Sequence, residues 1–384
     1  MRIAIEVAFN QGGYRGGDVY TYGLIKALAA IDAENEYFLF GYVFHDHQLW
    51  EQSVPCPDQR NFQRLIKRWP QVLVKRIERK WNLPLIESCL ERHRIDVYHS
   101  PGPALPRLRH IKSVVSIHDL TLLAHPEFVP SERLPVWRPE CLRAIDMATR
   151  VIASSHLIKD YVTRTLHQPE EKTHAVDLGI DHDVFFEIKD MARLAAVKKK
   201  YALPPQFVIA TGPYETRRNW EGLLQAVSKI QKGGTPLGVV LTGGIAPEYK
   251  KSVNKLIEDL QLHAVVQTGY VPLEDMVSLY NLATAFVYPA FYDSCSLTLI
   301  EAMACGAPAI ASAVGGLPEV AGGAALLIPS VDPDVITESM LRVMDPDVRT
   351  SFRAKGLQRA RQFSWDKAAR ATLAIYREAF LSQT

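Results

Sequence analysis

Short runs of β-branched and aromatic residues alternate along the chain with longer segments whose apolar residues recur at helical spacing. This alternation predicts parallel β-sheets covered by helices, so the fold class is expected to be α/β. The ten predicted strands are Ile3–Val7, Tyr37–Tyr42, Val97–His99, Val114–Ile117, Val151–Ala153, Phe207–Thr211, Gly238–Thr242, Val265–Thr268, Ala285–Tyr288 and Ala309–Ala311.

The strand and helix pattern falls into two stretches that meet near Asp177–Ile188, where a charged helix, Lys189–Lys200, is predicted to follow. A last helix, predicted over Ser364–Leu381, comes after the second sheet and can pack back on the first domain. Open α/β sheets bind ligands outside the carboxyl ends of their strands, so we expect the site in a cleft between the domains. The expected divisions are a Rossmann-like domain over 1–185, a second over 186–365 and the returning helix over 366–384.

The composition supports two soluble domains. The chain has 384 residues, about two to three times the commonest domain size. It is 47% hydrophobic and 22% charged, which excludes wholesale disorder. Because 44 Lys and Arg face 42 Asp and Glu, the net charge of +2 gives no reason to expect a nucleic-acid partner.

The cysteines and the first residues indicate a cytoplasmic protein. Five cysteines are widely spaced without a CxxC pair, which argues against a disulfide framework or a zinc cluster. The chain starts directly with a strand-like run, and no stretch of 18 or more apolar residues follows. We therefore expect a reducing compartment and no membrane span.

A polar loop followed by a helix, predicted over Leu297–Cys305, carries the richest chemistry. The backbone N–H groups at such a helix start form a seat for a phosphate, here at Ser296, Leu297 and Thr298. Asp293 precedes Glu301 by eight positions, so one carboxylate can accept hydrogen bonds from ribose hydroxyls and the other from a sugar. The alternative is that Asp293 only caps the helix and Glu301 is solvated.

The predicted strand over Phe207–Thr211 ends in a loop with two adjacent cations, Arg217 and Arg218, before a helix predicted over Asn219–Gln231. Paired guanidinium groups at the carboxyl edge of a sheet suit a diphosphate, which needs bidentate hydrogen bonds and charge neutralisation. Two solvated surface charges are the alternative.

Two segments of the first domain are candidates for ligand contact. The glycine-rich loop Gln11–Val19 does not have the G-x-G-x-x-G spacing of dinucleotide-binding proteins, which disfavours a dehydrogenase. Its glycines either contact a ligand or are turn residues that need a positive φ angle. His118 follows a predicted strand, and nothing nearby spells a Ser/His/Asp triad; a structural hydrogen bond is the alternative to ligand contact.

Asp293-x7-Glu301, followed by Gly315-Gly-Leu-Pro-Glu319, resembles the E-x7-E signature of retaining glycosyltransferases of family 4, which have the GT-B fold. The resemblance covers nearly the whole chain and implies two Rossmann-like domains that face a cleft, the domain over 1–185 binding the acceptor and the domain over 186–365 binding the nucleotide-sugar donor. It implies that Glu301 binds the nucleotide ribose, that Asp293 faces the donor sugar and that the amides between them bind the diphosphate. The chain departs from the family in its shorter first acid and in Ser296, where Gly is common.

The same resemblance assigns further residues. Arg217 and Arg218 match the family's R-K-N motif, with Arg in place of Lys, and are expected to stabilise the departing diphosphate. His118 is expected to reach the transferred sugar. The remaining contact candidates are Gly16 and Gly17 for the donor and Tyr14, His99 and Ser154 for the acceptor, a turn-forming role being equally open for the last two.

The implied activity is transfer of a hexose from a nucleotide diphosphate sugar to a glycan or lipid-linked hydroxyl in polysaccharide or glycoconjugate synthesis. UDP-glucose is slightly preferred as donor over GDP-mannose, with retention at the anomeric carbon and without metal or other cofactor. The alternatives are another GT-B enzyme, such as a sugar-nucleotide epimerase or an inverting transferase, and a catalytically silent sugar-nucleotide-binding subunit. Asp181-His-Asp183 spells the metal-binding D-x-D pattern, but it lies in the expected linker and is interpreted as a chance match.

The basic stretch Arg60–Lys80 holds eight Lys and Arg against one Glu. Phe62, Leu65, Ile66 and Trp69 have helical spacing with cations on the opposite face, a pattern typical of helices that lie on anionic membranes. Peripheral contact with the inner face of the membrane and an ordinary amphipathic helix packed on its sheet are equally open.

Overall fold

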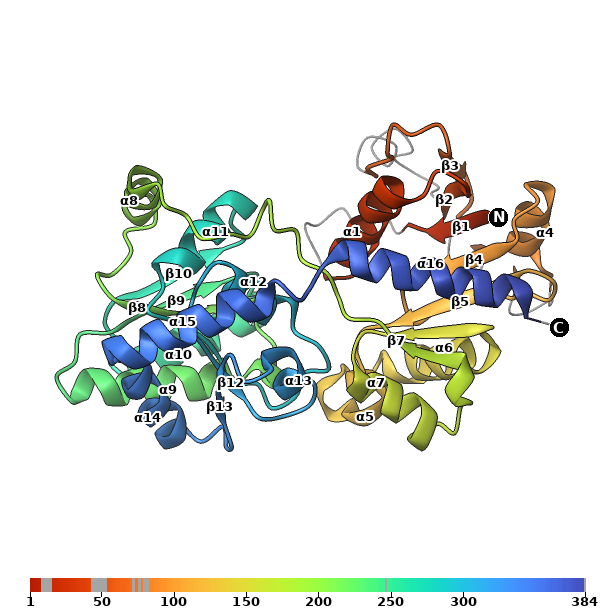
Figure 1. Ribbon diagram of the computed structural model, residues 1–384. Helices are drawn as coiled ribbons and strands as arrows, with labels where there is room; N and C mark the ends of the chain where they lie inside the picture. Colours follow the sequence, from red (N-terminus) through yellow and green to blue (C-terminus); the bar gives the residue numbers. More distant parts are fainter. Residues whose placement is uncertain are drawn as a thin grey trace. The chain divides into compact units, whose positions relative to one another are not determined.

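The computed structural model describes residues 1–7, 16–42, 54–70, 73–74, 77–78, 83–245 and 247–382. The chain forms two compact units (Figure 1). Unit 1 contains Met1–Gly179 and Ser364–Thr384, and unit 2 contains Ile180–Phe363. The chain therefore passes from one unit to the other twice, each time a few residues before the boundary expected from the sequence.

Unit 1 is built on a parallel sheet with the strand order β3-β2-β1-β4-β5-β6-β7. Its strand order reverses between β1 and β4, where Ile3 is paired with Val97. The strands are β1 (Arg2–Glu6), β2 (Glu36–Tyr42), β3 (Phe62–Lys67), β4 (Val97–Ser100), β5 (Lys112–Ile117), β6 (Arg150–Ala153) and β7 (Thr173–Ala175).

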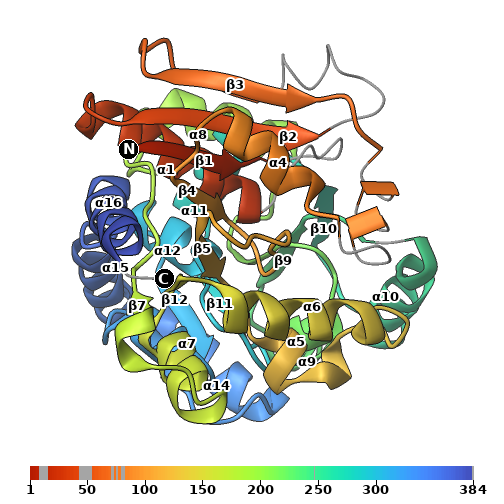
Figure 2. The same cartoon turned by 90° about the vertical axis from the view of Figure 1, so that its right-hand side faces the viewer.

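The helices of unit 1 include one from the far end of the sequence. They are α1 (Gly16–Ile31), α4 (Leu85–Arg92), α5 (Thr121–Ala124), α6 (Leu134–Met147), α7 (His156–Asp160) and α16 (Trp365–Leu381). Helix α16 packs on α1, and both views show the two side by side (Figures 1 and 2). A Cβ atom added to Gly23 of α1 would lie 2.3 Å from the Trp365 ring, and one added to Gly179 would lie 2.4 Å from it. The two glycines therefore make room for the indole that anchors α16.

Unit 2 contains a second parallel sheet, with the strand order β10-β9-β8-β11-β12-β13. Its strands are β8 (Phe207–Thr211), β9 (Gly238–Thr242), β10 (Val265–Gly269), β11 (Ala285–Tyr288), β12 (Ala309–Ser312) and β13 (Leu326–Ile328). Its helices are α8 (Met191–Lys200), α9 (Trp220–Lys232), α10 (Pro247–Asp259), α11 (Leu273–Leu282), α12 (Leu297–Ala304), α13 (Leu317–Ala321), α14 (Pro333–Met344) and α15 (Pro346–Ala360).

The core of unit 2 lies on both faces of its sheet. Successive strand residues point to opposite faces, so Ile209 joins the cluster that includes α11 and α12, whereas Val208 joins the cluster that includes α9 and α14. Burial on both faces explains why the strands read as continuous apolar runs in the sequence. The expected α/β architecture is confirmed.

The helix expected from the spacing of apolar residues within Arg60–Lys80 is wrong over Phe62–Lys67, whereas the described residues 73–74 and 77–78 of the same stretch are helical. Residues Phe62–Lys67 form strand β3, which pairs with β2 at the edge of the sheet (Figure 2). The rings of Phe62 and Tyr37 are stacked with their centres 4.5 Å apart. Pairing with a neighbouring strand therefore overrides the helical spacing of the apolar residues.

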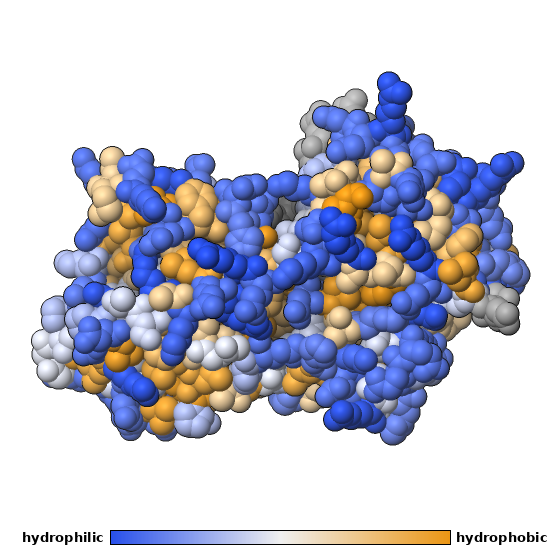
Figure 3. Space-filling model, viewed as in Figure 1, coloured by the Kyte–Doolittle hydropathy of each residue, from blue (hydrophilic) through white to orange (hydrophobic). Residues whose placement is uncertain are grey.

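Among the described residues, no helix is both long and apolar enough to cross a membrane. The face of the molecule seen in Figure 3 is mainly hydrophilic, with apolar patches spread between the polar side chains.

Candidate functional site

Two glycines shape the carboxyl edge of the sheet in unit 2. Gly212 follows β8 and Gly243 follows β9, and both have positive φ angles, +100° and +110°. A Cβ atom on Gly243 would lie 2.3 Å from the carbonyl oxygen of Gly212, and one on Gly212 would lie 2.6 Å from Nη1 of Arg218. Only residues without a side chain allow the two loops and the guanidinium group to approach so closely.

The two predicted arginines lie in a 3-10 turn between β8 and α9. Nε of Arg217 is 2.9 Å from Oε2 of Glu215, and Nε of Arg218 is 3.4 Å from the same oxygen. The Arg218 guanidinium also donates to the carbonyl oxygen of Thr211 at 3.2 Å and lies 5.5 Å from the centre of the Tyr288 ring. Their side chains are 14% and 12% exposed, so both cations are held in fixed positions rather than solvated.

Asn219 ends the turn and starts α9. It adopts a left-handed conformation with φ +53°, and its side-chain oxygen accepts a hydrogen bond from the N–H of Gly222 at 3.0 Å. Asparagine tolerates this conformation better than most residues and is a favourable helix cap. The residue therefore fixes where the arginine turn ends.

The Asp293 carboxylate is buried and contacts side-chain and backbone groups of different kinds. Oδ2 accepts a short hydrogen bond from the Tyr288 hydroxyl and lies 3.5 Å from Nη1 of Arg217. Oδ1 accepts from the backbone N–H of Cys295 at 3.3 Å. The carboxylate is therefore oriented by donors on either side.

The loop that carries Asp293 rests on the glycine pair of the Gly315-Gly-Leu-Pro segment. A Cβ atom on Gly315 or Gly316 would lie 2.1 Å from the carbonyl oxygen of Asp293 or Ser294, respectively. Gly316 N–H donates to the Asp293 carbonyl at 2.9 Å. These glycines therefore position the loop by close backbone contact.

Ser296 caps the helix α12 that follows this loop. Its hydroxyl oxygen accepts from the N–H of Leu299 at 3.3 Å and lies 3.1 Å from the Thr298 hydroxyl. Leu297 and Thr298 are partly exposed in the first turn, where an α-helix leaves N–H groups without intrahelical acceptors. The predicted phosphate seat thus has the right local geometry, although its use by a ligand stays a prediction.

Glu301 lies one turn further into α12 and is partly exposed. The Tyr280 hydroxyl donates to its Oε2 at 3.3 Å and lies 3.3 Å from the Thr211 hydroxyl. Burial raises the pKa of Glu301 to about 7, an effect that the tyrosine hydrogen bond only partly offsets. Hydroxyl donors from a bound ligand would favour the carboxylate form.

These contacts connect the four predicted side chains of unit 2. Arg217 reaches Asp293 directly, Tyr288 touches both Asp293 and Arg218, and Arg218 is linked to Glu301 through Thr211 and Tyr280. The sequence analysis did not include Tyr280 and Tyr288 among the site residues. Nothing in the sequence near them indicated a role in the site except that Tyr288 ends an apolar strand. We call this connected set the unit 2 network, consisting of Thr211, Arg217, Arg218, Tyr280, Tyr288, Asp293 and Glu301.

In unit 1, His118 follows β5 and is partly exposed. Its Nε2 is 3.1 Å from the carbonyl oxygen of Pro101 and must donate to it, so Nδ1 accepts from the Ser154 hydroxyl. The ring lies 4.1 Å from that of Tyr20, and burial lowers the pKa of His118 to about 4. The imidazole is therefore neutral at physiological pH, and its contact with a transferred sugar stays a prediction.

Two acceptor candidates of unit 1 are buried. His99 is fully buried, with Nδ1 2.6 Å from the Tyr376 hydroxyl and Nε2 2.8 Å from the Ser116 hydroxyl; burial lowers its pKa to about 3. Ser154 is 2% exposed and holds His118. Both side chains are engaged in hydrogen bonds within unit 1, and their contact with an acceptor stays a prediction. His99 ties α16 to the sheet.

The glycine-rich loop is described only in part. Tyr14 lies outside the described residues, and Gly16 is the first residue of α1. Gly17 has open space where a Cβ would be, and its backbone is not in the left-handed region. The need for a positive φ therefore does not explain this glycine, whose contact with a donor remains a prediction.

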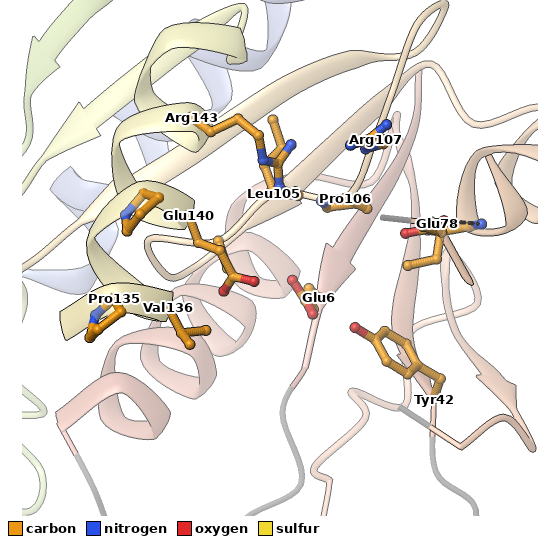
Figure 4. A pocket seen from close by; sticks show the side chains of 13 residues that line it. Glu6, Tyr42, Glu78, Leu105, Pro106, Arg107, Pro135, Val136, Glu140 and Arg143 are labelled. Carbon is orange, nitrogen blue, oxygen red and sulfur yellow. Dashed lines mark hydrogen bonds between the residues drawn. The ribbon is translucent and has the colours of Figure 1, made fainter. Parts of the chain in front are cut away.

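A cavity of about 700 Å³ opens in unit 1 and was not predicted from the sequence (Figure 4). It adjoins the ends of β1 and β2, and Ser100, at the end of β4, donates to Oε2 of Glu6 at 3.0 Å. The only sequence signal was Glu6, a charge that closes an apolar strand. We call the cavity the unit 1 pocket; it is lined by Glu6, Tyr42, Glu78, Ile86, Ala104, Leu105, Pro106, Arg107, Pro135, Val136, Pro139, Glu140 and Arg143.

The described residues contain no group of three or more His, Cys, Asp or Glu side chains placed to hold a metal ion. In the D-x-D sequence, Oδ1 of Asp181 accepts from the N–H of Asp183 at 3.1 Å, and His182 contacts the carbonyl oxygen of Phe363 at 3.0 Å. These contacts give the segment a structural role where the chain enters and leaves unit 2.

Comparison with known proteins covers both units. The family model for glycosyl transferases group 1 matches residues 195–362, and the model for glycosyltransferase family 4 matches residues 14–184. O-antigen chain mannosyltransferase B of Escherichia coli is 30% identical over 292 residues, which are 75% of this chain and 76% of the relative.

A second relative is much longer than this chain. The serotype-specific mannosyltransferase WbdA of Escherichia coli is 29% identical over 274 residues, which are 67% of this chain but only 32% of WbdA. Among solved structures, sucrose-phosphate synthase from Thermosynechococcus elongatus superposes with a TM-score of 0.77 at 21% identity over the whole of both chains. This likeness shows a shared fold.

Proposed function

Because the chain belongs to the group 1 glycosyltransferases of family 4, which have the GT-B fold, we propose that it transfers a mannosyl group from a nucleotide diphosphate sugar to a hydroxyl group of a glycan, with retention at the anomeric carbon. The unit 2 network carries the proposal, since it joins two cations and two carboxylates at the carboxyl edge of one sheet. The mannosyltransferase relatives favour mannose over the glucose that the sequence slightly preferred. GDP-mannose is therefore the first donor to test, with UDP-glucose beside it.

In the proposed reaction the acceptor oxygen attacks the anomeric carbon from the face on which the diphosphate leaves. The bond between that carbon and the phosphate oxygen breaks, and its electron pair stays on the diphosphate. The acceptor proton passes to a phosphate oxygen. Retention then needs no protein nucleophile.

The proposed work of the protein is to stabilise the charge that grows on the leaving diphosphate. Arg217 and Arg218 are fixed by Glu215 and by backbone carbonyls, so they need little reorganisation when this charge appears. The N–H groups at the start of α12 add partial positive charge. We expect these groups to replace a metal ion, so activity should persist in EDTA.

The two carboxylates have different proposed roles. Asp293 is already oriented by Tyr288 and Arg217, which suits hydrogen bonds to hydroxyls of the transferred sugar. Glu301 has a pKa raised to about 7 by burial, and two ribose hydroxyls would compensate its ionised form.

Calorimetric titration with GDP-mannose, GDP, UDP-glucose and UDP tests the proposal, together with a product assay in EDTA and an NMR assignment of the anomeric configuration. Glu301→Gln should weaken binding of the preferred nucleotide about tenfold or more, because a charged hydrogen-bond acceptor is lost. Glu338→Gln, the same change on an exposed position of α14, is the matched control. Equal binding by both variants, or binding without any turnover of donor, would contradict the proposal.

A further inference from the structure

Tyr288 is a rigid point at the carboxyl edge of the sheet in unit 2. It is the last residue of β11, and its side chain is buried. Its backbone is paired with Ala311 of β12, and its ring packs against that of Phe286 with the ring centres 5.9 Å apart. A side chain held by the sheet and by a neighbouring ring in a packed core has little freedom to move.

The hydroxyl of Tyr288 is a fixed donor to Asp293. It donates to Oδ2 of the carboxylate. Burial raises the pKa of Tyr288, and although Arg218 opposes this change, Asp293 adds to it, so the hydroxyl keeps its proton at physiological pH. The carboxylate therefore always meets a donor at this position.

The backbone and the carboxylate of Asp293 are both held on other sides as well. Oδ2 lies 3.5 Å from Nη1 of Arg217, and Oδ1 accepts from the N–H of Cys295 at 3.3 Å. The Asp293 carbonyl oxygen accepts from the N–H of Gly316 at 2.9 Å, and a Cβ atom on Gly315 would lie 2.1 Å from the same oxygen. A longer acid at this position therefore cannot gain room by a shift of its backbone.

The acid at position 293 is one methylene shorter than the glutamate of the signature that the segment resembles. An extra methylene would carry the carboxylate outward by up to about 1.5 Å, one carbon–carbon bond length. Because the oxygens of Asp293 already touch their donors, the longer side chain would press against them. Removal of the Tyr288 oxygen would free about the room that the methylene needs, so the hydroxyl and the short acid fit each other.

The ring of Tyr288 serves a different group from its hydroxyl. Cζ of Arg218 lies 5.5 Å from the centre of the ring, within the range of a cation–π contact. This contact does not involve the phenolic oxygen. Substitution by phenylalanine therefore separates the two parts of the side chain, since it removes the donor to Asp293 and keeps the ring beside Arg218.

We propose that Tyr288 is a positioning residue that makes aspartate the fitting acid at position 293, because its hydroxyl takes the place of the missing methylene and fixes the carboxylate for contact with the transferred sugar. Its ring separately supports Arg218, which is expected to bind the diphosphate. This inference rests on the proposed function and adds to it a buried residue that sets sugar recognition through Asp293.

The first test compares the binding of GDP-mannose with that of GDP, and of UDP-glucose with that of UDP, by calorimetry on the full chain. For the preferred nucleotide, Tyr288→Phe should weaken binding of the nucleotide sugar about tenfold and change binding of the nucleotide alone less than about twofold, because the ring stays beside Arg218. A residue that only supported the fold would lower both affinities alike.

Tyr37→Phe is the matched control for this test. The Tyr37 hydroxyl also donates to a buried aspartate, at 2.5 Å from Oδ2 of Asp32, but both residues lie in unit 1. This variant should unfold at a lower temperature than the unchanged protein and bind both ligands with unchanged affinity.

The second test asks whether the hydroxyl and the methylene replace one another. Asp293→Glu alone should lower kcat about tenfold or more, since the longer acid presses against the Tyr288 hydroxyl. The double variant Asp293→Glu/Tyr288→Phe should have a higher kcat than Asp293→Glu, although each single change lowers kcat. Residues that act independently would instead give losses that multiply. Initial rates of donor turnover measure kcat for the four proteins.

Two results would overturn the inference: a Tyr288→Phe variant in which binding of the nucleotide sugar and of the nucleotide is unchanged or equally weakened, or a double variant no more active than Asp293→Glu. The binding test removes a single oxygen atom, so it applies even where Asp293→Glu does not fold. Failure of the inference alone leaves binding and turnover by the unchanged protein intact. Failure of the proposed function appears in the unchanged protein itself, as absence of donor binding or turnover, and the inference falls with it.

Discussion

The two units share a parallel sheet with helices, but they hold their candidate residues in different ways. In unit 2 the expected side chains are charged and linked by contacts such as that of Arg217 with Asp293. In unit 1 the expected histidines are neutral, and His99 is sealed beneath α16. A set of charged side chains in unit 1 lines the pocket instead: Glu6, Glu78, Arg107, Glu140 and Arg143.

This difference separates two chemical tasks. Fixed cations suit a place where negative charge develops, because their stabilisation grows as the reaction proceeds. Neutral imidazoles suit hydrogen bonds to a neutral molecule. The first arrangement should therefore govern turnover and the second the choice of acceptor.

The largest expected effect comes from removing the cations of unit 2. The double variant Arg217→Ala/Arg218→Ala should lower kcat about 10²- to 10³-fold or more, as observed for loss of preorganised donors in other enzymes. Initial rates with GDP-mannose measure this effect. Arg342→Ala on the exposed side of α14 is the control, and a double variant with unchanged kcat would remove the distinction between the units.

Glycine replacement should act in opposite directions in the two units. Gly315→Ala places a Cβ 2.1 Å from the Asp293 carbonyl at φ +54°, so it should cost about 3 kcal/mol of unfolding free energy and weaken nucleotide binding. Gly17→Ala meets open space in α1 and should stabilise by up to about 1 kcal/mol. Urea unfolding followed by circular dichroism gives the change in unfolding free energy for both variants. If both changes had the same sign, the assignment of close packing to Gly315 would be contradicted.

The buried histidine of unit 1 should matter for stability alone. Tyr376→Phe removes the hydroxyl that bonds to His99, leaves a ring nitrogen without that partner and should cost about 2 kcal/mol. Thermal unfolding measures the loss. Nucleotide affinity should be unchanged, and a parallel fall in affinity would show that the histidine serves more than the attachment of α16.

The smallest expected effect is a pH dependence in unit 2. Burial raises the pKa of Glu301 to about 7, so the free protein binds a proton there below pH 7 that ribose hydroxyls should displace. Nucleotide affinity should rise with pH up to about 7, by at most about tenfold per pH unit, with proton release on binding. Calorimetry in buffers of different ionisation enthalpy measures the protons, and Glu301→Gln should abolish this part of the dependence.

Glu301 should also make the unfolding free energy depend on pH, in the direction opposite to its effect on nucleotide affinity. Its pKa is raised on folding, so the folded protein holds more protons than the unfolded chain between the unfolded value and about pH 7. The contribution of Glu301 to stability is therefore present at low pH and falls as the pH rises through this window. Comparing the unfolding free energies of the unchanged protein and Glu301→Gln across this range isolates it.

Most of the fold was predictable because ten strands are short apolar runs bounded by polar residues. The strands β7 (Thr173–Ala175) and β13 (Leu326–Ile328) have three residues each, too few to show a period. The edge strand β3 (Phe62–Lys67) exposes Arg64 and pairs on one side only, so its pattern was mistaken for a helix.

Site residues could be predicted from the sequence only where they lie close to one another along the chain. The residues of unit 2 fall in two short segments, around Arg217 and from Asp293 to Glu301, so local spacing reveals them. The charges of the unit 1 pocket lie as far apart as Glu6 and Arg143 and come together only through the sheet. No local pattern can show such a set.

Helix α16 also has a consequence for biosynthesis. Unit 2 is one continuous segment, whereas unit 1 needs Ser364–Thr384 to complete the contacts of Trp365 and Tyr376. On the ribosome the strands of unit 1 therefore emerge first but lack their last helix until unit 2 has been synthesised. Its unfinished face must stay protected from aggregation during that interval, so the first half of the chain is the more natural client for a chaperone.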